Sequence, residues 1–574
     1  MPDTEAEGAK GYSLISQAKG QNHHHCNTAL IGMGVVGVLI VCEGLRVFAF
    51  SFLLAHSIGK ERMYGTMFLE KVTEVNNSIN TFVWVTLGLA LLIGTGILMT
   101  ALTKFFQVGH FGHWMKETIG KVFNKNVSGH TKDKASISQF QALCTALAAT
   151  VGVGNIAGVA AAIAAGGPGA IFWMWVAAFF GMMTNFSENV LGIFYRRKVN
   201  GEWAGGPMYY LRDGLGKKKG CKWIGKVLAV LFACFAILAS FGIGNMGQVN
   251  KIVSNIESAF AIPALSEKMV YDGVSLYAVI IGGVLLVLAA LIILGGMQRI
   301  ARVAEKLVPT MIILFILGSL VVIGSNYTNV GAAFSSIFNH AFSGRAAVGG
   351  VVGVTLRQVI TWGFKRGVFS NEAGLGSSVM VHSCSNVKEP VRQGMWGVFE
   401  VFTDTMVICT MTALVILTSG MVHLDTGIMA AGVTDSTVVA SAFSSVFGKA
   451  GEMFIAIAIL LFAFTTVLGW SQYGSKAVEY LGGKRAKQIY QVFFVMLIMS
   501  GALMTSSLAW DISDTFNGLM MIPNLIGVIV LSGQVMKITQ NYIDRKIKHK
   551  NVAPLLSYDA RIQKQMEDEL AAQK

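Results

Sequence analysis

Two glycines and an asparagine near position 152 are the residues whose spacing first suggests a binding site. Gly152 and Gly154 are separated by one residue, Asn155 follows them, and all three sit inside an apolar segment at residues 140–165. These residue types weaken a helix, and non-helical backbone at membrane depth is tolerated only where protein buries it or where it lines a cavity. Gly154 and Gly158 are also four positions apart, which fits a small-residue helix-packing face. The stretch alone does not separate the two interpretations.

The composition defines the environment of this segment. The chain has 574 residues, of which 53% are hydrophobic and only 13% are charged. Several apolar runs exceed the roughly 20 residues that span a bilayer, which indicates a polytopic all-α membrane protein. The net charge of +14 comes from basic residues in short runs between apolar segments, which is typical of loops on one side of a membrane rather than of a nucleic-acid surface. The seven cysteines include no C-x-x-C pair and indicate neither a disulfide framework nor a zinc site.

The elements that position the segment are about twelve expected membrane spans. The first, at residues 28–55, carries Glu43 and Arg46 on one helix face, which we interpret as a buried ion pair. A polar loop is expected at residues 57–80, a span at 81–106, and a turn from Arg299 to Lys306 between two later spans. Loops rich in Lys and Arg alternate with loops that carry acidic residues. The positive-inside rule and an even number of spans therefore place both termini in the cytoplasm.

Four blocks of sequence resemble those of the alanine or glycine:cation symporter family, also called sodium:alanine symporters. The resemblance extends over residues 81–540 in the family's order, whereas residues 1–80 depart from the family pattern by one additional membrane helix. The blocks are QALCTALAATVG from Gln141, GGPMYY from Gly205, FSNEAGLGS from Phe369 and LGWSQY from Leu468.

The resemblance implies a leucine-transporter-like fold with two inverted five-helix repeats. The repeats would occupy residues 140–324 and 346–537, joined by an extracellular connector at 325–345. Residues 1–80 would hold a polar cytoplasmic tail, the additional helix and a loop. Residues 81–139 would hold the first family helix and a basic cytoplasmic loop, and residues 538–574 a cytoplasmic tail.

The same resemblance divides the broken segment between two ligands. Exposed amides at Gly152, Val153 and Gly154 would hold a substrate carboxylate at the positive end of the second half-helix, and Asn155 beside them is also expected to bind the substrate. Sodium prefers oxygen ligands, which the resemblance assigns to carbonyls of Ala148 and Val151 and hydroxyls of Thr465 and Thr466. The alternative for the two threonines is that each hydroxyl bonds back to its own helix.

Other polar and aromatic groups in the spans complete the expected substrate site. Gln248 lies in a glycine-rich interruption of the third core helix and could contact polar groups of the substrate while staying neutral. A second broken helix, near Gly350 and Gly353, would offer carbonyls to the substrate ammonium. Trp470 would limit the pocket or close its inner side, although a tryptophan at the membrane interface is the more common case.

Three residues are candidates for a gate or a second cation site. Thr150 directly precedes the break. Glu188 would either accept hydrogen bonds from the unwound sixth core helix or pair with a loop cation. Asp404 lies deep in its span, where it is either a cation ligand or a hydrogen-bonded structural aspartate.

Together these features predict a sodium-coupled symporter of the plasma membrane that imports small neutral amino acids, alanine or glycine, by alternating access. Proton coupling through Glu188 or Asp404 and a non-transporting sensor on the same fold are the alternatives. The expected partners are the amino acid, Na⁺ and the bilayer, with no nucleic acid and no organic cofactor. No H-E-x-x-H, G-x-S-x-G or Walker motif lies in a fitting context, so an enzyme is not expected. The oligomeric state is left open.

Overall fold

The computed structural model describes residues 62–124, 127, 129, 136–271, 273–343, 354–504 and 508–571, and these residues are mostly helical. Among them, eight helices are long and apolar enough to cross a membrane, or nine if the bent pair Gln139–Thr150 and Gly154–Gly166 counts as one span. The polytopic membrane class is confirmed, whereas the total of twelve spans stays a prediction. The expected first span, with Glu43 and Arg46, lies outside the described residues.

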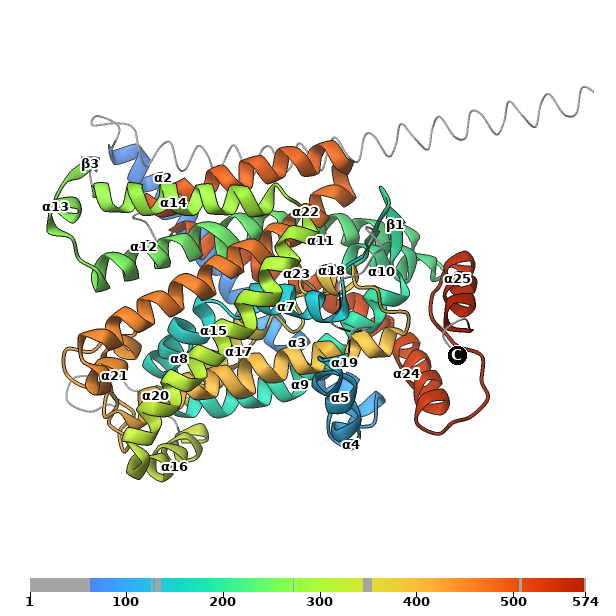
Figure 1. Cartoon of the computed structure of the whole chain (residues 1–574), viewed down its shortest axis with the longest axis horizontal. Coiled ribbons are helices and arrows are strands. Elements are labelled where there is room, and N and C mark those ends of the chain that lie inside the picture. The colour runs from blue at the N-terminus through green and yellow to red at the C-terminus, as the bar shows by residue number, and fades with distance from the viewer. Residues whose placement is uncertain are drawn as a thin grey trace, which may run out of the picture.

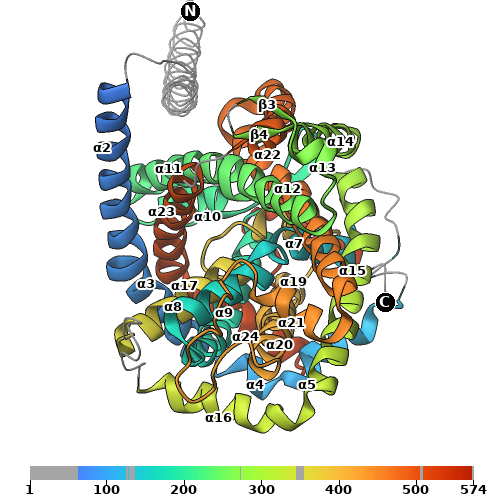
Figure 2. The same ribbon diagram turned by 90° about the vertical axis from the view of Figure 1, so that its left-hand side faces the viewer.

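The first described span is one long helix made of α2 (Arg62–Thr81), η1 (Phe82–Leu87) and α3 (Gly88–Leu102). It stands along one side of the molecule, where α2 contacts α23 (Figure 2). The polar loop expected at residues 57–80 is wrong from Arg62 onward, because α2 begins there. This helix contains no proline, so nothing in it prevents the apolar helix from continuing into polar sequence. Three short helices follow: α4 (Phe106–Gly109), α5 (Phe111–Glu117) and η2 (Ile119–Lys121).

The glycine-rich segment is a broken helix, as predicted. It consists of α7 (Gln139–Thr150), the π-helical turn η3 (Gly154–Gly158) and α8 (Val159–Gly166), with a bend of 54° between the two halves. Ser138 caps α7, because its hydroxyl accepts from the N–H of Gln141 at 3.1 Å and its own N–H donates to the Gln141 side chain at 3.0 Å.

The next helices build the rest of the first half of the bundle. They are α9 (Gly169–Phe194), α10 (Pro207–Asp213), η4 (Leu215–Lys217), α11 (Lys222–Phe241), the π-helical turn η5 (Gly242–Met246), α12 (Gly247–Ala259), α13 (Pro263–Ser266), α14 (Leu276–Ile293), α15 (Met297–Ser325), η6 (Tyr327–Asn329) and α16 (Val330–Ala341). Two antiparallel hairpins interrupt them: β1 (Arg197–Val199) with β2 (Glu202–Ala204), and β3 (Met269–Tyr271) with β4 (Val274–Ser275).

The turn expected from Arg299 to Lys306 is wrong, because both residues lie inside α15. The chain reverses just before this helix, where Gly296 has a φ of 76°. Glycine adopts this left-handed conformation without steric cost. The basic residues therefore mark the start of a helix and not a loop.

The second half of the bundle repeats the pattern of long helices. Its elements are α17 (Leu356–Asn371), α18 (Val379–His382), α19 (Pro390–Val401), the π-helical turn η7 (Phe402–Cys409), α20 (Thr410–Thr418), α21 (Val438–Phe447), α22 (Lys449–Ala502), α23 (Leu508–Val530), α24 (Ser532–Lys546) and α25 (Ala560–Ala571). The long α22 comprises two helices that meet in a kink at Gly483.

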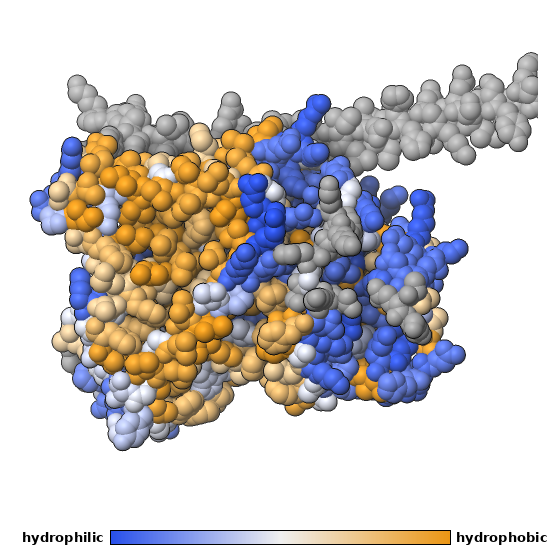
Figure 3. Space-filling model, in the orientation of Figure 1, coloured by the Kyte–Doolittle hydropathy of each residue, from blue (hydrophilic) through white to orange (hydrophobic). Residues whose placement is uncertain are grey.

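The packing places the broken helix inside the bundle. Helix α22 contacts α7 and α12, while α9 packs against α17 and α19 (Figure 1). One face of the molecule is hydrophobic over α14 and α15, where Leu288, Leu291, Leu314 and Leu317 are exposed, as expected of side chains that meet lipid (Figure 3). The opposite end is hydrophilic. It is formed by β1, β2, α10, α24, α25, the segment 383–389 and the kink of α22, and it is called the polar end below.

Candidate functional site

The break leaves two carbonyl groups without their helical donors. Val151 departs from helical conformation with φ −78° and ψ 85°. The N–H of Gly152 donates to Oδ1 of Asn155 at 2.9 Å instead of to Ala148, and the N–H of Asn155 donates to the carbonyl of Gly152 at 3.2 Å instead of to Val151. Carbonyls released in this way at the end of a half-helix are suited to a cation. They belong to the two residues whose carbonyls were predicted to bind sodium, Ala148 and Val151.

Asp404 fixes the break against the second half of the bundle. Its Oδ1 accepts from the side-chain amide of Asn155 at 2.7 Å, and its Oδ2 accepts from the hydroxyls of Ser370 at 2.6 Å and Thr405 at 3.0 Å. The hydroxyl of Thr412 donates to the carbonyl of Asn155 at 2.8 Å. Both oxygens of Asp404 are thus engaged by neutral donors from three elements, an arrangement that matches the hydrogen-bonded alternative for this residue.

The two threonines of α22 lie differently with respect to the break. Both hydroxyls donate to the carbonyl of Phe462, at 3.0 Å from Thr465 and 2.9 Å from Thr466. Thr466 nevertheless faces the break, since a Cβ added to Gly152 would lie 2.4 Å from its Oγ1. Only glycine permits this approach, and the oxygen keeps lone pairs for a cation. The hydroxyl of Thr465 instead lies 3.6 Å from the sulfur of Met311 on α15.

Gln248 reaches the break from α12. Its Nε2 donates to the carbonyl of Ile243 at 3.0 Å, a group that belongs to the π-helical turn η5. Its Oε1 lies 3.5 Å from the N–H of Val153, at the long limit of a hydrogen bond. π-helical turns are frequent at functional sites. Three of them, η3, η5 and η7, supply groups to this region.

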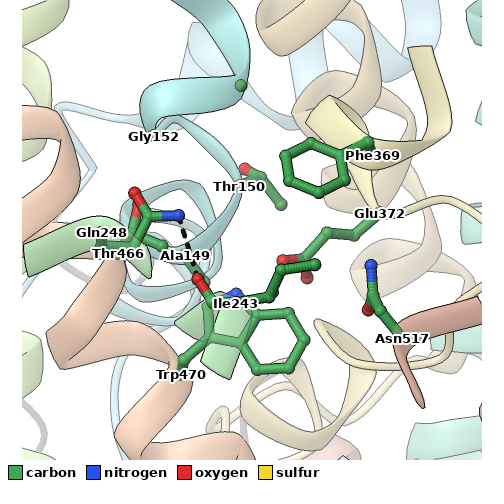
Figure 4. A pocket seen from close by; sticks show the side chains of 11 residues that line it. Ala149, Thr150, Gly152, Ile243, Gln248, Phe369, Glu372, Thr466, Trp470 and Asn517 are labelled. Atoms are coloured by element: carbon green, nitrogen blue, oxygen red, sulfur yellow. Dashed lines mark hydrogen bonds between the residues drawn. The ribbon is translucent and has the colours of Figure 1, made fainter. Parts of the chain in front are cut away.

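A small cavity lies between the break and α22 (Figure 4). Its volume of about 20 Å³ accommodates a water molecule but not an amino acid, so a substrate requires the walls to move apart. Trp470 forms part of the wall and is only 2% exposed, which does not fit an interfacial anchor. The lining residues are Ala149, Thr150, Gly152, Gly154, Ile243, Gln248, Phe369, Glu372, Thr466, Trp470 and Asn517.

The structure separates the predicted substrate residues into two groups. Gly152, Gly154, Gln248 and Trp470 line the cavity together. Asn155 turns away from it toward Asp404, and Val153 reaches Gln248 through its N–H. Gly350 and Gly353 lie outside the described residues.

Sequence reasoning missed Glu372, Asn517 and Phe369 as cavity residues. Glu372 follows α17 with a φ of 55°, in the left-handed region that few non-glycine residues adopt, and its Oε2 accepts from the hydroxyl of Ser377 at 2.5 Å. Figure 4 shows its carboxylate directed toward the middle of the cavity. A glutamate inside the glycine-rich block FSNEAGLGS was the available signal. No sequence signal pointed to Asn517, because its place in the cavity lining depends on how α23 is rotated in the bundle.

Glu188 lies outside the cavity lining, on α9. Its carboxylate accepts from the side-chain amide of Asn524, which also donates to the carbonyl of Gly374 at 2.8 Å. Asn524 in turn accepts from the hydroxyl of Tyr210. Glu188 is therefore joined, through Asn524, to the backbone that follows α17, and no ion pair with a loop cation is found for it in the described part of the chain.

The carboxylate of Glu400 is also buried, near those of Glu188, Glu372 and Asp404. Nε2 of His382 lies 2.9 Å from it, and Nδ1 of His382 accepts from the side-chain amide of Gln393 at 2.6 Å. Across the described residues, no group of three or more His, Cys, Asp or Glu side chains is arranged to hold a metal ion.

A polytopic helical bundle with a half-helix break, buried carboxylates and a small cavity at the break is typical of a secondary transporter. The comparison with protein families agrees, because the model of the sodium:alanine symporter family matches residues 69–554. The chain belongs to this family.

Three relatives illustrate the range of names within it. The sodium/alanine symporter AgcS of Methanococcus maripaludis is 42% identical over 83% of this chain and 98% of its own length. A Bacillus subtilis protein provisionally named sodium/glutamine symporter GlnT is 37% identical over 81% of this chain and 90% of its own. A second B. subtilis protein, provisionally named sodium/proton-dependent alanine carrier protein YrbD, is 36% identical over 82% and 92%. The family's members are transporters and not enzymes.

Proposed function

We propose that this chain is a sodium-coupled symporter that imports small neutral amino acids, alanine or glycine, by alternating access. The observation that carries the proposal is the broken helix, in which the carbonyls of Ala148 and Val151 have lost their helical donors before the break and the N–H groups of Gly152 and Val153 follow it. Thr466 adds an oxygen to the cation side. Sodium bound there would favour the state that binds substrate, which couples the two ligands.

The side-chain oxygens at the break support the carboxylate half of the proposal. Asn155 and Gln248 each place an amide oxygen on an N–H of the break, at 2.9 Å from Gly152 and 3.5 Å from Val153. A substrate carboxylate supplies the same kind of acceptor with a full negative charge. It could displace the distant oxygen of Gln248, which would then be free to contact the substrate.

The tight walls support a small substrate. Trp470, Phe369 and Thr466 close around the break, and a Cβ on Gly244 would lie 2.4 Å from the Trp470 side chain. Opening this space enough for alanine needs less movement than opening it for glutamine. Competition by glycine, both alanine enantiomers and glutamine against labelled alanine uptake would rank the substrates.

The finer fold is part of the same proposal. Five helical units, α7 with α8, α9, α11 with α12, α14 and α15, precede five others, α17, α19 with α20, the two halves of α22, and α23. This order supports two inverted repeats of a leucine-transporter-like fold, with twelve spans and both termini in the cytoplasm of a plasma-membrane protein.

Uptake of labelled alanine into proteoliposomes tests the coupling. We expect accumulation with an inward sodium gradient and at least about tenfold less when choline replaces sodium at constant pH. Equal uptake without sodium would refute sodium coupling, and no uptake of any amino acid would indicate a non-transporting sensor.

Proton coupling is a second candidate that one specific observation favours. Glu188, Glu372, Glu400 and Asp404 are all buried, and the side chains that donate hydrogen bonds to Glu188, Glu372 and Asp404 are neutral. Such carboxylates can take up protons as well as sodium ions. An inward proton gradient that drives uptake in sodium-free medium would establish this candidate in place of the first.

A further inference from the structure

Three hydrogen-bond acceptors line the cavity and belong neither to the sodium site nor to the carboxylate site proposed at the break. They are Thr150 at the end of α7, Glu372 after α17 and Asn517 on α23, and they are called the acceptor cluster below. Oγ1 of Thr150 and Oδ1 of Asn517 are buried and have no hydrogen-bond partner among the described residues. Figure 4 shows the side chains of Glu372 and Asn517 on the same side of the cavity, with Gly152 on the other.

Glu372 also has no cationic partner among the described residues. The groups that act most strongly on its carboxylate are the hydroxyl of Ser377, the indole of Trp470 and the carboxylates of Glu400 and Asp404, and none of these is a cation. A buried carboxylate is unfavourable unless a positive charge or several donors meet it, and a buried acceptor without a donor is unfavourable for the same reason. The cluster therefore lacks a ligand that combines positive charge with several N–H or O–H groups.

We propose that the acceptor cluster binds the ammonium group of the amino-acid substrate. An ammonium group carries one positive charge and three N–H donors, which matches one carboxylate and two neutral oxygens. The substrate would then lie across the cavity, with its carboxylate on the N–H groups of the break and its ammonium on Glu372, Asn517 and Thr150. This inference rests on the proposed function, and it assigns the half of the substrate that the break leaves without a partner.

The same oxygens could instead hold a sodium ion, because sodium also prefers carboxylate, amide and hydroxyl oxygens. The effect of a substitution in the cluster distinguishes the two ligands. Loss of the ammonium site weakens amino-acid affinity at saturating sodium, whereas loss of a sodium site raises the sodium concentration for half-saturation at saturating amino acid.

The test is ligand binding to the purified full-length protein in detergent, measured by the rise in unfolding temperature with alanine and, separately, with sodium. For Glu372→Gln we expect the alanine dissociation constant to rise at least about 30-fold, the effect of losing a charge-assisted bond. The sodium half-saturation should change less than about threefold. An unchanged alanine constant, or a shift confined to sodium, would overturn the proposal.

Asn517→Ala provides the second variant if the glutamate substitution does not fold. Because Oδ1 of Asn517 has no partner in the part of the chain that the structure describes, its removal breaks no bond seen there, and we expect alanine affinity to fall about fivefold or more. An alanine affinity equal to that of the unaltered protein would count against the cluster.

Glu479→Gln is the matched control. This glutamate is also buried, but it is paired with Lys487 at 3.3 Å and lies outside the cavity lining, so alanine affinity should stay within about threefold. If the unaltered protein binds no amino acid at all, the proposed function fails. If it binds alanine and Glu372→Gln binds it equally well, only the ammonium site fails.

Discussion

Buried carboxylates occur in two regions of this molecule and are neutralised in different ways. At the polar end, Glu389 is held by Arg545 through two bonds of 2.7 and 2.8 Å, and Glu479 lies 3.3 Å from Lys487. Around the break, Asp404 is held by Asn155, Ser370 and Thr405, all of them neutral. The carboxylates named at the polar end are paired with fixed cations, whereas Asp404 at the break is held by neutral donors.

The difference separates structural charges from charges available to a ligand. A buried ion pair is complete in itself, and removing one partner leaves an unfavourable charge. A carboxylate surrounded by neutral donors keeps part of its negative potential and attracts a cation from solution. On this basis we propose that the central carboxylates are available to a transported cation or an ammonium group, whereas those of the polar end hold helices together.

The largest effect is expected from Asp404→Asn, which tests whether the central network needs a full negative charge. Asparagine has an NH2 group in place of one carboxylate oxygen. This group would face a donor, either the amide of Asn155 or the hydroxyl of Ser370, so at least one hydrogen bond at the break is lost. With about 1–3 kcal/mol for each unsatisfied buried group, we expect alanine uptake by proteoliposomes to fall at least about 100-fold. Uptake within tenfold of the unaltered protein would show that the negative charge is dispensable. Asp435→Asn, on an exposed loop, is the control.

A smaller effect is expected from Thr466→Ala, which tests where the mobile cation lies. Its Oγ1 faces Gly152, whereas the hydroxyl of Thr465 lies against Met311. Loss of one oxygen ligand should raise the sodium concentration for half-maximal uptake about 5- to 10-fold. Thr465→Ala should shift it less, and equal shifts in the two variants would contradict the placement of the cation at the break.

The sequence predicted local features better than contacts between distant segments. The break at Gly152 to Asn155 was predictable because glycine and asparagine weaken a helix locally, and Gln248 because an amide is rare in an apolar segment. Which of Thr465 and Thr466 faces the break depends on how α22 is rotated against α7 and α15, and no local sequence pattern determines that rotation. For the same reason Asn517 was missed. The error at Arg299 came from taking charge as a sign of a loop, when a helix end that reaches water also tolerates charge.

The smallest effect is expected at the polar end, where pH tests the fixed pairs. Burial raises the pKa of Glu202, but Lys476 at 3.1 Å and Lys487 at 3.5 Å outweigh it and hold the pKa below the usual value of 4.5. A carboxyl group whose pKa is lowered by folding stabilises the protein above its unfolded pKa, and this contribution is lost as pH falls through the folded pKa.

The unfolding temperature in detergent should therefore decrease as pH falls below about 4.5, and less steeply in Glu202→Gln than in the unaltered protein. The difference should be modest, because the Glu202 side chain is 42% exposed and solvent screens its pairs. Parallel pH profiles would mean that these ion pairs contribute nothing to stability. In that case fixed cations at the polar end would not be structural, and the contrast with the central carboxylates would lose its physical basis.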